Sequence, residues 1–492
     1  MSFVDLRFLF FFPAVAILNF LFPQRFRWVV LLLASYIFYM AWKPEYGLLL
    51  LLITSIDFFA GRLMGKTSDE KLRRLYLIAS LVSNLGLLFF FKYFNFVFES
   101  FGYALDALGS SASIPVLNVL LPIGISFHIF QSLSYTIDVY RRNVEPVSHF
   151  GKFALYVSFF PQLVAGPIER PQRLLKQFFE SRKFDLHKAQ EGVLLVLWGY
   201  FKKLVIADNI APLVNAVYTD PTNFPGPTLA IATILFAYQI YCDFSGYSDI
   251  ARGTAKILGY DLMKNFDRPY ASKSIGEFWR RWHISLSTWF RDYVYVPLGG
   301  SIGTAQKTSR NLMVTFLLSG LWHGANWTFV LWGGLNGIYL VIQRLYTHVE
   351  VWSPVKVSIR PHRLVRRVAQ HTLVLTLICI TWVFFRAQTI SEAFYIFTHI
   401  PTGILSFVES LGSETGRLHV LAMDIGWKGL LIGVIAIIIL ETVDYFHARY
   451  GIGNKLAHMP YLPRAVLYST SICAILLLGA LGSPQQFIYF QF

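Results

Sequence analysis

The residues of this sequence best suited to chemistry lie in the segment EFWRRWHISLSTWFRDY, residues 277–293. Its five formal charges would cost more than about 10 kcal/mol at the centre of a bilayer, so it is not a simple span. Helical spacing places two different sets of side chains on two faces. One face carries Trp279, Trp282, Leu286, Trp289 and Tyr293, and the other carries Arg280, His283, Ser287 and Arg291. The pattern predicts an amphipathic helix at an interface or at the mouth of a cavity.

Two interpretations of this segment stay open. An arginine-rich helix can be anchored to lipid headgroups by its tryptophans. Alternatively, Arg280, Arg281 and Arg291 bind an anionic substrate, such as the phosphates of coenzyme A, because guanidinium groups match phosphate geometry. In that case His283 faces the same cavity.

A second candidate is His323 in the motif WHGAN, Trp322 to Asn326, with apolar sequence on both sides. A single histidine in an apolar helix is usually structural. This one lies beside Gly320, Gly324, Gly333 and Gly334, which permit close approach of backbone or ligand. Ionisable groups at membrane depth are functional candidates. A neutral imidazole there could accept a hydroxyl proton as a general base during acyl transfer.

Two further polar segments are expected to line a cavity. Residues 238–253 place Asp243, Tyr247 and Asp249 in a membrane segment interrupted at Gly246, either to contact substrate or to pair with arginines. Residues 122–141 align polar side chains on one helical stripe, in which the histidine is expected to be a satisfied core residue. The stripe consists of His128, Gln131, Tyr135 and Asp138. The proline-rich stretch 159–171 predicts a broken element beside such a cavity.

Composition indicates a membrane protein. Of the 492 residues, 55% are hydrophobic and 14% are charged, against about 25% charged in soluble domains. Apolar runs close to the roughly 20 residues needed for a crossing predict about 11 transmembrane helices. Despite the net charge of +15, the basic residues are spread between the apolar runs, which argues against nucleic acid. Because basic loops stay cytoplasmic, the alternation places both termini outside the cytoplasm.

The organisation predicts one membrane domain, residues 1–492, with a catalytic core at roughly 115–345. Residues 149–168 and 312–345 have basic loops on both sides, so they are expected to be hairpins or re-entrant elements next to a buried cavity. The three cysteines lie in apolar runs and are expected to be buried, with no disulfide or zinc site. Motifs for phosphate hydrolysis, hydride transfer and serine hydrolysis are absent from the sequence.

Several motifs together resemble the bacterial alginate O-acetyltransferases of the membrane-bound O-acyltransferase superfamily. They are SIGEFWRRWHISLSTWFRDYVYVPLGG (274–300), FLLSGLWHGANWTFVLWGGLNG (316–337), QIYCDFSGYSDIA (239–251), FFPQLVAGPIERP (159–171) and FIYFQF (487–492). The resemblance spans most of the chain and keeps the motifs in order.

This resemblance implies that His323 is the catalytic histidine and His283 a second functional histidine. It also implies an all-helical fold around a central tunnel. The donor would be acetyl-CoA, with no permanently bound cofactor or metal. A periplasmic SGNH-type partner would receive the acetyl group and acetylate the polysaccharide, which places the protein in the bacterial inner membrane.

Rival functions remain. Within the superfamily they are D-alanyl transfer to teichoic acid and acetyl transfer to peptidoglycan. A transporter is the rival from another class, because intramembrane Asp, Arg and His also mark substrate paths. Transporters commonly contain repeated halves, and none is visible in this sequence.

Overall fold

The computed structural model describes residues 1–110, 115–352, 363–412, 427–450, 459–482 and 485–490. Within these ranges every regular element is a helix and no strand occurs, which confirms the all-α prediction. The chain divides into two compact units. Unit 1 comprises Met1–Val196 and Tyr247–Met263, and unit 2 comprises Leu197–Gly246 and Lys264–Phe492. The single membrane domain stays a prediction.

Six helices in the described part of the chain are long and apolar enough to cross a membrane. They are Tyr46–Lys66, Glu70–Ala107, Gly226–Ile257, Val365–Arg386, Lys428–Tyr450 and Tyr461–Leu478. The sequence predicted about 11 crossings. Several apolar runs fold as shorter or interrupted helices instead. For example, a π-helical turn, η4 (Phe201–Ala207), interrupts the helical stretch between α9 (Leu186–Tyr200) and α10 (Asp208–Thr219).

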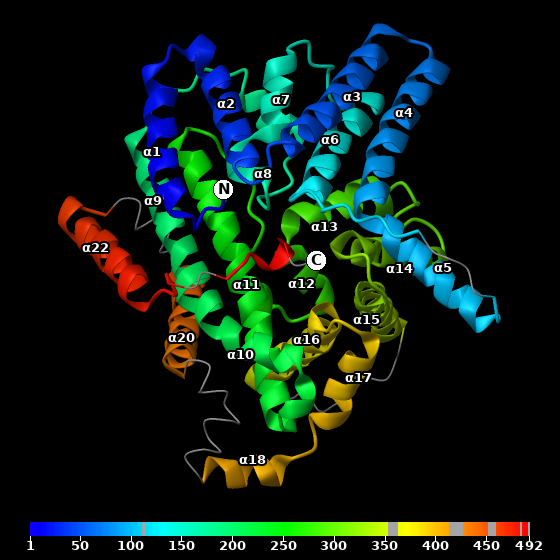
Figure 1. Ribbon diagram of the computed structural model, residues 1–492, viewed down its shortest axis with the longest axis vertical. Coiled ribbons are helices and arrows are strands. Elements are labelled where there is room, and N and C mark those ends of the chain that lie inside the picture. Colours follow the sequence, from blue (N-terminus) through cyan, green and yellow to red (C-terminus); the bar gives the residue numbers. More distant parts are fainter. Residues whose placement is uncertain (111–114, 353–362, 413–426, 451–458, 483–484, 491–492) are drawn as a thin grey trace. The chain divides into compact units, whose positions relative to one another are not determined.

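Unit 1 is built from the N-terminal helices. They are α1 (Leu6–Leu21), α2 (Arg27–Met40), α3 (Tyr46–Lys66), α4 (Glu70–Leu88), α5 (Phe94–Ala107), α6 (Ile125–Tyr140), α7 (Phe150–Ser158), α8 (Phe160–Leu163) and the first part of α9. Helices α3, α4 and α6 pack together (Figure 1). The buried Arg73 joins their ends by donating to the carbonyl oxygens of Met64 at 2.6 Å and Val139 at 3.0 Å. Because buried polar groups need partners, these bonds fix how the helices pack.

The polar stripe of α6 lies inside unit 1. His128, Gln131, Tyr135 and Asp138 are all buried. The His128 Nε2 atom lies 2.6 Å from the carbonyl oxygen of Leu163, which confirms the expected core histidine. The chain from Phe159 to Pro171 is broken as predicted, because α8 has only four residues between α7 and a π-helical turn, η3 (Pro171–Leu175).

Unit 2 begins within α9 and contains η4, α10 and the part of α11 (Gly226–Ile257) up to Gly246. Its later elements are α12 (Ile275–Arg281), α13 (Ile284–Phe290), a π-helical turn η7 (Arg291–Tyr295), α14 (Ala305–His323), α15 (Trp327–Trp352), α16 (Arg363–Arg386), α17 (Ile390–His399), α18 (Ile404–Leu411), α20 (Trp427–Tyr450), α22 (Tyr461–Leu478) and a 3₁₀ turn η9 (Ile488–Phe490). Helices α14 and α15 form the helical hairpin that the sequence predicted within 312–345.

Three local predictions were wrong. Residues 277–293 form two short helices separated at Trp282 and His283, not one amphipathic helix. Helix α11 continues through Gly246 instead of being interrupted there. Its glycine permits close packing, because a Cβ at that position would lie 2.7 Å from the Gly199 carbonyl oxygen. Of the three cysteines only Cys242 is buried, whereas Cys379 is partly exposed and Cys473 is exposed.

Candidate functional site

His283 lies at a sharp kink between α12 and α13. Its φ and ψ are 43° and 55°, the left-handed region that non-glycine residues rarely adopt. Asn265 stabilises the kink: its carbonyl oxygen accepts from the Ile284 N–H at 2.8 Å and its Oδ1 from the Ser285 N–H at 3.3 Å. Backbone strain of this kind persists where the surroundings impose it, and it is frequent at active sites.

His323 is the last residue of α14, at the tip of the hairpin with α15. Two glycines bring these helices into backbone contact. A Cβ at Gly320 would lie 2.2 Å from the Phe329 carbonyl oxygen, and one at Gly333 would lie 2.3 Å from the Phe316 carbonyl oxygen. The predicted role of glycine in close packing is therefore confirmed at these two positions.

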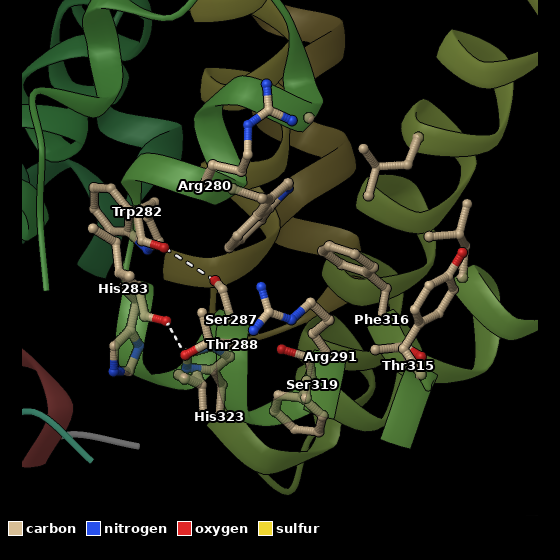
Figure 2. Close-up of a pocket in the computed structure, with 18 residues that line it drawn as sticks. Arg280, Trp282, His283, Ser287, Thr288, Arg291, Thr315, Phe316, Ser319 and His323 are labelled. Carbon is tan, nitrogen blue, oxygen red and sulfur yellow. Dashed lines mark hydrogen bonds between the residues drawn. The ribbon is translucent and has the colours of Figure 1, made fainter. Parts of the chain in front are cut away.

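Both histidines line one cavity of about 460 Å³, which lies entirely in unit 2 (Figure 2). The walls come from α12, α13, η7, α14 and α15, so the two motifs that the sequence singled out meet there. Ser287, Thr315 and Ser319 add hydroxyl groups to a mainly aromatic and aliphatic lining. A largely apolar cavity with a few convergent polar groups is typical of a ligand site.

Aromatic rings surround the two imidazoles. The ring of His323 lies 4.9 Å from that of Trp332 and 5.3 Å from that of Phe385, between ring centroids. The ring of His283 lies 4.6 Å from that of Phe244. Burial lowers the pKa of His283, which lies outside the candidate spans, to about 3. This histidine is therefore neutral at physiological pH, and its unprotonated ring nitrogen can accept a proton.

The three candidate arginines differ in position. Arg280 and Arg291 are exposed and line the cavity, and in Figure 2 the Arg291 guanidinium points into the group of lining side chains while that of Arg280 lies beyond them. Arg291 also pairs with Asp292 at 2.7 Å. Arg281 is held by Glu277 at 2.7 Å and is not among the lining residues. Of the three candidates, Arg280 and Arg291 thus line this cavity.

The other predicted site residues are not among those that line the cavity, and each makes structural contacts. Trp322 is buried, and its ring is 5.0 Å from that of His323. Asn326 donates to the Gln388 carbonyl oxygen at 3.1 Å and accepts from the Thr328 N–H, which closes the hairpin tip. Asp243 is buried in an ion pair with Lys203. Tyr247 and Asp249 belong to unit 1, where the Tyr247 ring packs on Phe3 and Asp249 pairs with Arg252. A direct substrate contact for these residues stays a prediction.

The sequence did not single out Tyr489, which lies beside the two histidines, or Lys203, which lies elsewhere in the same unit. Tyr489, in the C-terminal motif, has its ring 5.6 Å from that of His323 and 6.3 Å from that of His283. Lys203 forms two buried ion pairs in the same unit. A lysine inside the apolar run 193–206 was a signal for the second, because a charge there needs a partner. For Tyr489 there was no such signal in the sequence. The C-terminal motif contributed to the family resemblance, but nothing in it indicated a contact with the histidines.

Comparison with known proteins agrees with this geometry. The model of the MBOAT, membrane-bound O-acyltransferase family matches residues 79–385. The "Probable alginate O-acetylase AlgI" of Azotobacter vinelandii is 38% identical over 430 residues, 87% of this chain and 82% of that protein. The protein of the same name from Pseudomonas putida is 35% identical over 98% of both chains. The peptidoglycan O-acetyltransferase of Helicobacter pylori is 34% identical over 76% of this chain and 73% of that protein.

The chain belongs to the membrane-bound O-acyltransferase family. It is a multi-pass membrane enzyme that transfers acyl groups, and its substrate is therefore an acyl donor.

Proposed function

We propose that this enzyme takes acetyl groups from cytoplasmic acetyl-CoA and passes them across the bacterial inner membrane for O-acetylation of an exopolysaccharide such as alginate. The observation that carries the proposal is that His323, His283, Arg280 and Arg291 share one cavity. The names of the relatives that match most of the chain support acetyl as the group and alginate as the class of polymer.

In the proposed reaction, the two exposed arginines bind the phosphates of coenzyme A by charge-assisted hydrogen bonds. An acceptor hydroxyl attacks the thioester carbonyl carbon while His323 takes the hydroxyl proton. The C–S bond then breaks, and the proton passes from the imidazole to the departing coenzyme A sulfur. A variant of this scheme, in which the His323 imidazole first carries the acetyl group, gives the same products.

The proposal includes about 11 crossings, periplasmic termini, a tunnel between the two faces and an SGNH-type periplasmic partner that acetylates the polymer. A reporter enzyme that is active only outside the cytoplasm, fused to either end, should be active. An inactive reporter at both ends would contradict the proposed topology.

The direct test is release of free coenzyme A from acetyl-CoA by the purified full-length protein supplied with the periplasmic partner. His323→Ala should lower the rate by about 100-fold or more, the usual contribution of a general base. His399→Ala is the matched control, because His399 lies at the end of α17 and does not line the cavity. Full activity of His323→Ala would refute the assignment.

Acetyl transfer to peptidoglycan is a second candidate, because the Helicobacter pylori enzyme of that name is 34% identical to this chain. Deleting the gene and measuring ester-linked acetate on each isolated polymer separates the two. Coenzyme A release would exclude both D-alanyl transfer, whose donor is a carrier protein, and simple transport.

A further inference from the structure

Unit 2 also contains a buried cluster of charged side chains. The Lys203 Nζ atom lies 2.8 Å from Asp208 Oδ1 and 2.8 Å from Asp243 Oδ1. All three side chains are at most 6% exposed. One ammonium is shared by two buried carboxylates, and buried charged groups need further hydrogen bonds to compensate for the loss of water.

Part of that compensation comes from the C-terminal segment 485–490, which we call the strap. The backbone N–H of Ile488 donates to Asp243 Oδ2 at 2.7 Å, and Lys203 Nζ donates to the Gln485 carbonyl oxygen at 2.9 Å. These bonds join residues 245 and 282 positions apart in the chain. The charge cluster therefore holds the strap at two points, Gln485 and Ile488.

The residue after Ile488 contacts the catalytic histidines. The Tyr489 ring stands near both imidazoles and is 4.5 Å from the Phe244 ring, which in turn packs on His283. In Figure 1 the red C-terminal segment ends beside α12 and α13, in agreement with these contacts. Tyr489 is not among the residues that line the cavity, so it supports the imidazoles from another side.

The close packing of η4 on α11 lets Lys203 approach Asp243. Asp243 and Gly246 lie about one turn apart on α11, and a Cβ at Gly246 would lie 3.3 Å from the Lys203 Cβ. The π-helical turn η4 carries Lys203, and such turns are frequent at functional sites. Both helices are thus shaped around this cluster.

We infer that Lys203 and Asp243 are positioning residues, which hold the strap so that Tyr489 fixes the orientation of His283 and His323. The inference rests on the proposed function in one respect, namely that these histidines carry out acyl transfer. It assigns to Asp243 a task different from the substrate contact predicted from the sequence.

The test measures the mobility of the strap directly. A spin label is attached to Gln486→Cys, an exposed strap position, in the full-length protein with Cys379 and Cys473 replaced by alanine. Asp243→Asn and Lys203→Met should convert the immobile spectrum into a mobile one. Glu441→Gln is the matched control, because this carboxylate accepts from Tyr238 on the same helix α11 and does not touch the strap.

Ile488→Pro tests the anchoring of the strap without changing the charged side chains of the cluster. Proline removes the single N–H that donates to Asp243, and it is tolerated at the first position of a helical turn. This variant should also release the label, and it decides the question if Asp243→Asn fails to fold. An immobile label in Ile488→Pro would overturn the inference.

Acyl transfer gives the second measurement. In variants with a mobile strap, kcat should fall about tenfold or more while the KM for acetyl-CoA stays within about twofold, since the arginines are untouched. A mobile strap with unchanged kcat would overturn the positioning role. If the label responds as expected but the wild-type protein releases no coenzyme A, the anchoring stands and the proposed function fails.

Discussion

His128 in unit 1 and His323 in unit 2 are both buried histidines on apolar helices, yet their surroundings differ. His128 is bonded to the Leu163 carbonyl oxygen at 2.6 Å within packed helices. His323 lies at a helix end, between aromatic rings, and lines a cavity with a second histidine. The comparison teaches that burial alone does not distinguish a histidine of the core from one at a candidate site. The distinguishing feature of His323 is a cavity that it shares with a second histidine and with polar groups.

The largest effect on folding is expected from His128→Ala. The substitution removes a buried side chain and leaves the Leu163 carbonyl oxygen without its partner, so the free energy of unfolding should fall by about 2–4 kcal/mol. Thermal unfolding in detergent measures the change. His323→Ala should cost less, because its ring borders a cavity; an equal loss would weaken the comparison.

The arginines that line the cavity should affect the KM for acetyl-CoA, which gives a second test of the cavity around His323. Arg280→Ala and Arg291→Ala should each raise the KM for acetyl-CoA by about 10- to 100-fold, the value of hydrogen bonds to a charged group. Arg281→Ala is the control, since Arg281 is held by Glu277 outside the lining. Steady-state kinetics decides, and equal effects of all three would contradict this account of the cavity.

The kink at His283 should depend on Asn265. In Asn265→Ala the buried Ser285 N–H loses its acceptor, which should cost about 1–3 kcal/mol and lower kcat about tenfold. Asn265→Asp keeps an oxygen at this position and should restore most of the activity. If alanine and aspartate behave alike, the kink does not depend on this hydrogen bond.

The stability of the protein should also depend on pH. Burial lowers the pKa of His283 to about 3, whereas in the unfolded chain it is about 6.5. Between these values the unfolded state binds the proton first, so the free energy of unfolding should fall as the pH is lowered, by up to about 1.4 kcal/mol per unit. His283→Gln should reduce this slope. An unchanged slope would mean that another group causes it.

Much of the site was predictable from local patterns. A histidine among glycines in an apolar run, and a charged segment too costly to span a bilayer, both indicated a cavity, and both histidines line one. The hairpin of α14 and α15 followed from the basic loops on both sides of residues 312–345. These predictions succeeded because each depends on residues that are neighbours in sequence.

The remaining features depend on distant partners. At the kink, the two N–H groups that follow His283 donate to Asn265, which lies outside both short helices. The pairing of Asp243 with Lys203 requires the π-helical turn of η4, and the strap arrives from the far end of the chain. Gly246 indicated a break, but its function is close helix packing. Helical periodicity carries no information about such contacts.

The claim that His323, and not His128, takes part in acyl transfer is tested most directly by glutamine variants of both histidines. His128→Gln can still donate to the Leu163 carbonyl oxygen, whereas His323→Gln cannot act as a base. Coenzyme A release is measured on equal amounts of folded, full-length protein. The account predicts that His128→Gln keeps most of its activity and that His323→Gln loses about 100-fold or more. Equal loss in both variants, or full activity of His323→Gln, would contradict it.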